Sequence, residues 1–337
     1  MKRGILYIFL GIGMLFGYAI STLLSNKTAK PSDTEIQKVP VHSKIDEIRN
    51  QNLGALIGEL AHFVDRDLDS IGKVSDKTIH RIKVASTAFH PYYPVANDSL
   101  SELLLSPERG LLLTMLIASD IDSISFDQIN RQVTVEYADL KDADLSGVDL
   151  SDINLDGARF TNAKAIGADF SRALLRYVDF SLADVSHSIF HHADLNHASF
   201  YAVKADHASF RAAKMNGVNF ENARIRFANF TNAVAEWSNF NHALASRANF
   251  NSTRLKGSDF SKAVLNGASF DLSEVSKVVL TDSRIDSTSW DSALVASEDW
   301  MAQEFATTAD ADQLKLIYET QPDADLENRF RLVKKTR

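Results

Sequence analysis

The protein has no cysteine, no excess of basic residues and none of the short motifs that mark common catalytic sites. Without cysteine, disulfide bonds, thiolate metal ligands and cysteine nucleophiles are all excluded. A formal net charge of -8 argues against a generic nucleic-acid binder, which carries a basic stripe, so we expect no nucleic-acid partner. The chain also lacks a phosphate-binding loop, a zinc-protease helix, a nucleophile elbow and a dinucleotide fingerprint. The sequence therefore predicts no catalytic residue, no cofactor and no enzyme activity.

One long stretch without charge lies at the N-terminus. Residues 5–24 are uncharged and stand between basic residues, and their length suits a helix that crosses a hydrocarbon layer about 30 Å thick. We therefore expect residues 1–26 to be an N-terminal transmembrane helix that anchors the protein. A cleaved signal peptide is the alternative, because residues 19–21 form a small-x-small sequence, but the apolar stretch exceeds the ~7–15 residues of such a region.

The anchor sets the expected location of the remaining chain. The basic residues on its two sides are nearly balanced, with a slight excess before it, which favours a cytoplasmic N-terminus. The protein is then a single-pass protein of a bacterial inner membrane, with its bulk in the periplasm. Gly13 and Gly17 form a small-xxx-small pair that would let two anchors pack closely, which leaves a homodimer open.

A polar linker at 27–40 is followed by a predicted α-helical region at 41–130. Apolar residues recur at three- and four-residue spacing over 45–71, which indicates a long amphipathic helix. A second segment of this kind spans 75–89 and ends ahead of a proline, which disfavours helix at the residue before it.

A third helix is predicted immediately before the repeats. Ser106 and Pro107 supply an N-cap hydroxyl and an N1 proline, and the apolar run 111–118 follows them. A repeat structure needs its apolar end covered, because a bare end exposes core and unpaired backbone. We therefore expect this helix to be the N-terminal cap.

The centre of the sequence is an uninterrupted run of five-residue repeats. Every fifth residue from Leu140 to Trp290 is apolar, thirty-one positions without an insertion. Two residues before each of them stands a small or β-branched residue, which is alanine at eighteen of the thirty-one positions. A period of five fits neither the ~3.6 of an α-helix nor the ~2 of a strand. We therefore expect two residues of each repeat to point inward and the chain to turn a corner at every repeat.

A second period, of ten residues, indicates the number of sides in a coil. Phenylalanine occupies all twelve positions from Phe160 to Phe270 in steps of ten. With three sides each phenylalanine would lie above another residue type, whereas with four sides residues twenty apart stack on one another. Four sides predict core ladders on two opposite walls, one of Phe160, Phe180, Phe200 and Phe220 and one of Phe170, Phe190, Phe210 and Phe230.

The repeat motif resembles that of the pentapeptide-repeat family. Ala-Asp-Leu-x-x occurs as Ala138-Asp139-Leu140, as Ala143-Asp144-Leu145 and as Ala193-Asp194-Leu195. The resemblance covers 138–290 and not the flanking regions. It implies a mainly β fold, a right-handed quadrilateral parallel β-helix, which we place at 131–290. Similar proteins have diverse functions, and the best understood of them bind DNA gyrase by imitating the shape and negative charge of DNA.

The charge distribution bears on that role, which requires an acidic surface along the whole rod. Residues 136–156 contain seven acids and one base, but residues 157–290 contain twelve acids and fifteen bases. Only the first coil is strongly acidic. A cytoplasmic gyrase-binding DNA mimic is therefore an alternative rather than the favoured interpretation.

Outward-facing side chains supply the remaining candidates. His187 and His207 are twenty residues apart and stack on one outer corner, where two imidazoles are a weak metal candidate. The column offers no third ligand, so we expect a solvated polar column and no metal. Tyr177, His197 and Trp237 share another outward column and are candidates for protein contacts, because exposed aromatic residues are typical of binding hot spots. The alternative is that a neighbouring segment covers them.

The C-terminal segment 291–337 is expected to cap the other end of the repeats. Helical patterns occur near 297–305 and 312–318, and a basic tail, either a packed strand or a short tail, ends the chain. The whole sequence favours a membrane-tethered structural or scaffold protein whose rigid β-helix presents a protein-interaction surface to an unknown partner. An envelope enzyme with a dispersed active site is the second alternative.

Overall fold

The computed structural model describes residues 41–93, 95–96, 99–100, 104–304, 311–326 and 329–335. The predicted anchor at 5–24 and linker at 27–40 lie outside these residues. Within the part of the chain that is described, no helix is both long enough and apolar enough to span a membrane. Residues 45–337 form one compact unit.

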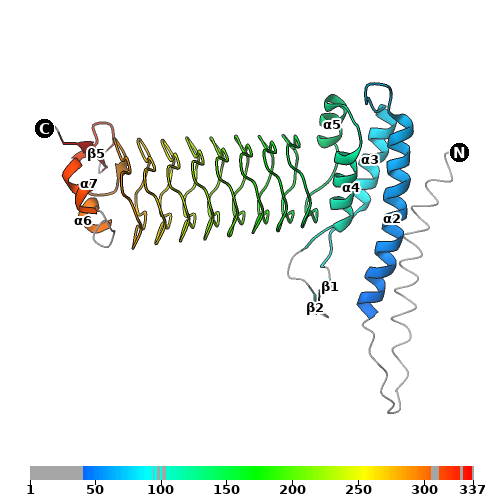
Figure 1. The fold of residues 1–337 in the computed structure, drawn as a ribbon, viewed down its shortest axis with the longest axis horizontal. Helices are drawn as coiled ribbons and strands as arrows, with labels where there is room; N and C mark the ends of the chain where they lie inside the picture. The colour runs from blue at the N-terminus through cyan, green and yellow to red at the C-terminus, as the bar shows by residue number, and fades with distance from the viewer. Residues whose placement is uncertain are drawn as a thin grey trace, which may run out of the picture. The chain divides into compact units, whose positions relative to one another are not determined.

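Among the described residues, four helices precede the repeats (Figure 1): α2 (Val41–Asp67), α3 (Asp76–Ala88), α4 (Pro107–Ala118) and α5 (Ser123–Asn130). Their buried apolar side chains form a small core of their own, which includes Val64, Ile82, Leu116 and Ile129. The helix predicted over 45–71 is present but begins and ends earlier, because α2 spans Val41–Asp67 and Ile71 beyond its end is 74% exposed. Asp69 ends it, since the Asp69 carboxylate accepts hydrogen bonds from the backbone of Ile71 and Lys73 in a turn.

A small hairpin separates α3 from α4. Strands β1 (Val95–Ala96) and β2 (Ser99–Leu100) pair antiparallel. An antiparallel bridge between Tyr92 and Leu105 continues this pairing away from the turn. The hairpin brings the chain back to Ser106, which caps α4: its side chain accepts a hydrogen bond from the backbone N–H of Arg109. This is the helix start that the sequence predicts.

The repeat region is a four-sided parallel β-helix, because each coil takes twenty residues. Parallel bridges join residues twenty apart at every repeat, from Asp139 with Arg159 to Glu274 with Leu294. Around the first of these bridges, Arg159 N donates to Ala138 O at 2.9 Å and Leu140 N donates to Arg159 O at 2.8 Å. The predicted four-sided coil is therefore confirmed, and it is visible as successive loops in Figure 1.

Each corner of the coil is a tight turn with one left-handed residue. Ala143 N, for example, donates to Leu140 O, and Asp142 between them has φ 60. Glycine fills some of these corners, but most carry another residue at the same φ, as Trp237 does at φ 59. A left-handed residue costs roughly 1–2 kcal/mol, which the bonds to the neighbouring coils offset. The left-handed conformation turns these side chains outward in columns.

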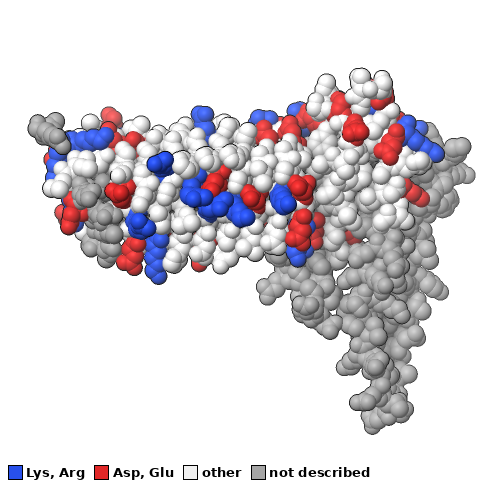
Figure 2. Space-filling view, viewed as in Figure 1, with Lys and Arg blue, Asp and Glu red and all other residues white. Residues whose placement is uncertain are grey.

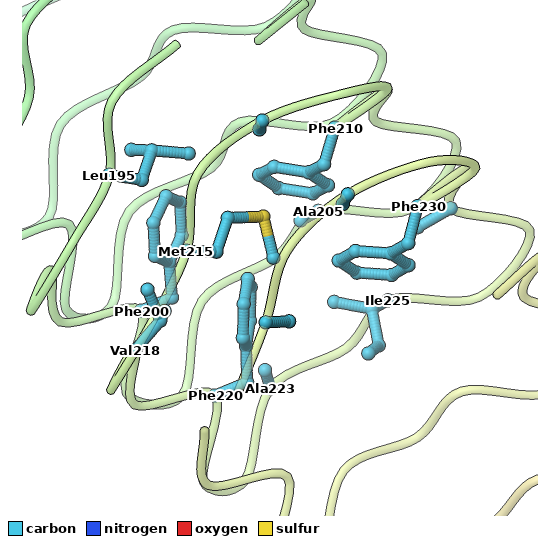
Figure 3. Close-up of a cluster of buried hydrophobic side chains, with 14 of the residues drawn as sticks. Leu195, Phe200, Ala205, Phe210, Met215, Val218, Phe220, Ala223, Ile225 and Phe230 are labelled. Atoms are coloured by element: carbon cyan, nitrogen blue, oxygen red, sulfur yellow. The ribbon is translucent and has the colours of Figure 1, made fainter. Parts of the chain in front are cut away.

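Stacked phenylalanines fill the interior. Phe160 and Phe180 stack with ring centroids 4.5 Å apart, and Phe170 and Phe190 stack at 4.9 Å. Rings of the two ladders meet edge to face, with 6.0 Å between Phe160 and Phe170. Figure 3 shows the two ladders approaching from opposite sides, with Leu195, Met215 and Ile225 on the walls between them. Edge-to-face packing explains why a ladder of one residue type fits on two opposite walls.

The N-terminal end is covered by α4 and the segment before it. Ser106 pairs in parallel with Ala138 and so adds a rung to the edge of the first coil. Leu113 lies in the core of the repeats, whereas Leu112 and Leu116 lie in the core of the helices. Leu111, by contrast, is 47% exposed, so only part of the apolar run 111–118 acts as a plug.

The C-terminal end differs from the predicted helical cap. Helices α6 (Trp300–Glu304) and α7 (Ala311–Ile317) are present, but the last coil is covered by an antiparallel sheet of β3 (Leu294–Val295), β5 (Phe330–Lys334) and β4 (Tyr318–Pro322). The basic tail is thus the central strand of a sheet. A strand covers this end because only a strand can pair with the open backbone edge of a coil.

The sheet and α6 close the edge and the core together. Leu332 N donates to Ala293 O at 2.9 Å, which pairs β5 with the end of the last coil. Trp290 extends the phenylalanine ladder, with its ring 4.2 Å from that of Phe270, and Trp300 of α6 lies next at 5.9 Å. The cap is therefore mixed α and β rather than helical.

A phenylalanine inside a ladder should be far more sensitive to truncation than an outward residue of the same coil. Phe210→Ala removes a fully buried ring that stacks on two others, and we expect it to lower the free energy of unfolding by about 3–5 kcal/mol. Lys204→Ala is the control and should change it by less than about 0.5 kcal/mol. Denaturant titrations followed by circular dichroism measure both. Equal effects of the two changes would contradict the ladder.

Gly110 tests the contact between α4 and the first coil. A Cβ atom at this position would overlap the carbonyl oxygen of Asp139. We expect Gly110→Ala to destabilise the protein by about 1–3 kcal/mol and to increase hydrogen exchange at the backbone of the first coil. Gly58→Ala on α2 is the control: a Cβ there meets nothing within 4 Å, so it should be neutral or stabilising. Unchanged exchange in Gly110→Ala would show that α4 does not seal the coil.

Candidate interaction surface

The most distinctive surface feature of the repeats is a pair of outward columns at opposite corners. We call Tyr177, His197, Gly217, Trp237 and Gly257 the first column, and His187, His207, Phe227, Arg247 and Gly267 the second. Members of one column are twenty residues apart, and the two columns are offset by ten residues, which is half a coil. Every member adopts the left-handed corner conformation, which turns the side chains of the members other than glycine away from the core.

The first column contains the predicted interaction residues. Tyr177 is 68% exposed and Trp237 is 59% exposed, so no described segment covers them. Tyr177 stacks on His197 with ring centroids 5.2 Å apart and an interplanar angle of 13°. Trp237 lies against the corner at Gly257, where a Cβ atom would overlap the indole ring. The structure therefore places the three residues on one corner, with a glycine between His197 and Trp237.

The second column is a continuous ring stack that extends beyond the two histidines. His187 and His207 stack at 4.9 Å and 2°, and His207 stacks on Phe227 at 4.8 Å and 1°. The guanidinium of Arg247 then lies over the Phe227 ring, 5.5 Å from its centroid. The prediction from the sequence was limited to the two histidines and did not include Phe227 or Arg247. The twenty-residue spacing was the signal that would have joined them to the stack.

The histidine geometry does not suit a shared metal. Imidazole lone pairs lie in the ring plane, so two parallel rings stacked at 4.9 Å direct their nitrogens side by side rather than at one point. Zinc requires each nitrogen at about 2.0–2.1 Å. Among the described residues no group of three His, Asp or Glu side chains lies close enough together to hold a metal ion.

Ion pairs bind neighbouring coils along the faces. Asp206 and Arg226, which are twenty residues apart, are paired at 2.8 Å, and Arg224 adds a second contact to Asp206 at 2.9 Å. Asp152 and Arg172 pair in the same way at 2.6 Å, and the hydrogen bond from Arg172 holds the pKa of Asp152 below its usual value. Exposed pairs of this kind contribute little stability each. They also neutralise part of the surface, and Figure 2 shows basic and acidic side chains mixed along the visible face of the repeats.

A cavity of about 240 Å³ lies where the helices meet the first coils. Leu116, Ile117, Phe126 and Val148 form much of its wall, and Asp127 stands at its side. The Asp127 carboxylate is paired with Arg131 at 3.0 Å.

The repeat region matches two family models. The model described as a pentapeptide repeat region matches residues 183–260, and the model for pentapeptide repeats in eight copies matches 138–176, 153–191 and 246–282. With the four-sided coil and its corner columns, these matches make residues 138–282 a region of the pentapeptide-repeat family, whose coil is the right-handed β-helix that the resemblance implies. The flanking helices and the C-terminal sheet lie outside the matched residues.

Solved structures with pentapeptide repeats are similar to parts of the chain. HetL, involved in heterocyst differentiation regulation in the cyanobacterium Nostoc sp. strain PCC 7120, is 22% identical over 46% of this chain and 84% of its own, with a TM-score of 0.24. QnrB1, a plasmid-mediated fluoroquinolone resistance protein, is 20% identical over 44% of this chain and 76% of its own, with a TM-score of 0.33. A protein of the Arabidopsis thaliana thylakoid lumen is 26% identical over 41% and 69%, with a TM-score of 0.20. No curated protein matches the sequence significantly.

Proposed function

We propose that the protein is a membrane-tethered scaffold whose β-helix presents its outer corners to a protein partner. The observation that carries this proposal is the pair of exposed ring columns. Aromatic and arginine side chains dominate the binding energy of protein interfaces, and here they stand on a backbone that cannot rearrange between coils. Tyr177, Trp237 and Phe227 are already held in place by their neighbours, so little side-chain entropy is lost when a partner binds.

The charge of the repeats supports this role over DNA imitation. Along 157–290 the bases outnumber the acids by fifteen to twelve, and acids such as Asp206 and Glu236 are paired with arginines of the next coil. A surface that imitates a nucleic acid must carry net negative charge along its length. The exposed rings, by contrast, supply apolar contact area of the kind that a protein partner buries.

The membrane part of the proposal rests on residues 5–24, whose length and lack of charge suit a single-pass anchor. An N-terminus in the cytoplasm leaves the repeats on the other side of the membrane, in the periplasm of a bacterium with two membranes. Tethering confines the β-helix to a layer near the membrane and raises its effective concentration for a partner in the same layer.

Fusions to the C-terminus test the topology. Alkaline phosphatase fused after Arg337 should be active, and a fluorescent protein that folds only in the cytoplasm should be dark, because the anchor exports the chain. The matched control lacks residues 2–30 and should give the opposite pattern. Carbonate extraction should leave the full chain with the membranes if the anchor is uncleaved. An inactive phosphatase and a bright fluorescent protein, each fused to the full chain, would place the repeats in the cytoplasm.

Photo-crosslinking tests the corner columns as an interaction surface. p-Benzoylphenylalanine at position 177 or 227 keeps an aromatic ring on each column and should give discrete protein adducts in intact cells. Position 84 on α3 is the control, because Val84 is also exposed but belongs to neither column. Denaturing electrophoresis separates the adducts. If the control position yields the same adducts, or the corners yield none, the columns are not the interaction surface.

A further inference from the structure

The first column has a gap between two of its rings. The second column has no such gap, because a ring stands at each of its corresponding positions. The rings of the first column lean over the corner of the following coil, since a Cβ atom at Gly217 would stand 2.9 Å from Nδ1 of His197 and one at Gly257 would overlap the indole of Trp237. The His197 ring therefore lies at the level of Gly217, and the Trp237 ring lies two coils further on, at Gly257. A side chain of residue 217 would occupy the level between them, but glycine has none.

The interval has the width of one stacked ring. One coil step separates the ring centroids by 5.2 Å in the pair Tyr177 and His197. Two steps give roughly 10 Å between His197 and Trp237, which is about twice the ~4.8 Å strand spacing. The three atoms nearest to a Cβ atom at Gly217 all belong to His197, so apart from the adjacent residues no other side chain comes closer to that position than the His197 ring.

The second column shows how such an interval looks when it is filled. His207 lies between His187 and Phe227, with its ring centroid 4.9 Å from the first and 4.8 Å from the second, and all three rings are parallel within 2°. The same coil spacing therefore accepts a planar ring with contacts on both faces. This is a favourable environment for an aromatic group, whose two faces are buried at once.

We propose that the interval between His197 and Trp237, the Gly217 slot, is a docking site for an aromatic side chain of the protein partner. The proposal rests on the proposed function and names the part of the surface that recognises the partner. A phenylalanine, tyrosine or tryptophan of the partner inserts between the two rings and completes the ladder. The exposed face of Trp237 is then buried as well, which is typical of a hot-spot residue.

The charges around the slot favour a neutral occupant. The charged side chains on the flanking faces and corner balance one another, with acids at Asp194, Glu236 and Asp259 and bases at Lys214, Arg254 and Lys256. Glu236 and Arg254 are paired with each other. An aromatic side chain carries no charge, whereas a nucleotide would bring a phosphate that needs an excess of bases.

Two amide groups beside Gly217 suit a peptide backbone. The side-chain oxygen of Asn216 accepts a hydrogen bond from Glu236 N at 3.1 Å, and that of Asn219 accepts one from Glu221 N at 3.0 Å. These bonds hold the two side chains in place. Within the described residues neither NH2 group donates to a protein acceptor, so both can donate to backbone carbonyls of the segment that carries the inserted ring.

The test uses the full-length chain and a capped peptide, acetyl-Gly-Ser-Trp-Ser-Gly-amide, as the probe. Its binding is followed by the NMR signal of the Trp237 indole N–H, which Trp237→Phe identifies. We expect saturable shifts and an affinity at least about five-fold higher than that of the same peptide with cyclohexylalanine in place of tryptophan, because a puckered ring stacks less well. Equal affinity for the two peptides, or no shift, would overturn the proposal.

A matched pair of variants ties the binding to the slot. Gly217→Phe supplies the missing ring from the chain itself and should weaken the tryptophan peptide at least about ten-fold. The backbone of this corner accepts phenylalanine, since Phe227 has φ 58 at an equivalent one, and the His197 ring, 2.9 Å from a Cβ atom at 217, has to move slightly to make room for it. Gly167→Phe is the control. Position 167 is twenty residues before His187 of the second column, and a Cβ atom there meets nothing within 4 Å, so this variant should leave the affinity for the peptide unchanged. Equal affinities in the two variants would show that the peptide binds elsewhere.

Two further probes test whether the slot binds a sugar or a nucleotide instead of an aromatic side chain. The crosslinks distinguish failure of the slot from failure of the proposed function. Cellotetraose or adenosine monophosphate, if bound more tightly than the tryptophan peptide, would overturn the assignment to an aromatic side chain. If no peptide binds but positions 177 and 227 still form adducts, the slot is wrong and the interaction surface stands. If both fail, the proposed function fails with it.

Discussion

Backbone hydrogen bonding between residues twenty apart is the constraint on which the rest of the structure depends. It holds each coil one strand spacing from the next, and it repeats without interruption from Asp139 to Leu294. Because the spacing is constant, every side chain lies above a residue of the same position in the next coil. The phenylalanine ladders, the pairs of Asp and Arg, and the two outward ring columns are all consequences of this one register.

The same register explains why the surface is suited to recognition without rearrangement. A corner residue is held by its own left-handed turn and by the hydrogen bond from its N–H to the following coil, so its side chain has a defined direction. Rings on such corners are preorganised, and a partner gains their contacts at small entropic cost. A gap in a column has a fixed position and width for the same reason that a ring has a fixed direction. The gap left by Gly217 is therefore as preorganised as the rings beside it.

The two ends of the β-helix show which parts of the structure local sequence patterns can predict. Ser106 and Pro107 predicted the start of α4 correctly, because an N-cap and an N1 proline act within one turn of helix. The C-terminal cap was predicted as helical, and the structure shows a sheet in which β5 lies between β3 and β4. Short helices do occur there, but the pairing of Leu294 with Arg331 joins residues far apart in the chain and leaves no periodic signal.

The sequence by itself determined the four-sided coil, the inward residues and the positions of the ladders, because the five- and ten-residue periods state which residues share a wall. It also placed Tyr177, His197 and Trp237 in one column. Only the tertiary structure decided that the rings lean toward the following coil, that Arg247 covers Phe227 and that Gly217 leaves a ring-wide interval. Periodicity specifies which residues are neighbours, whereas the direction of a side chain and the space beside it depend on the packing of all the atoms around it.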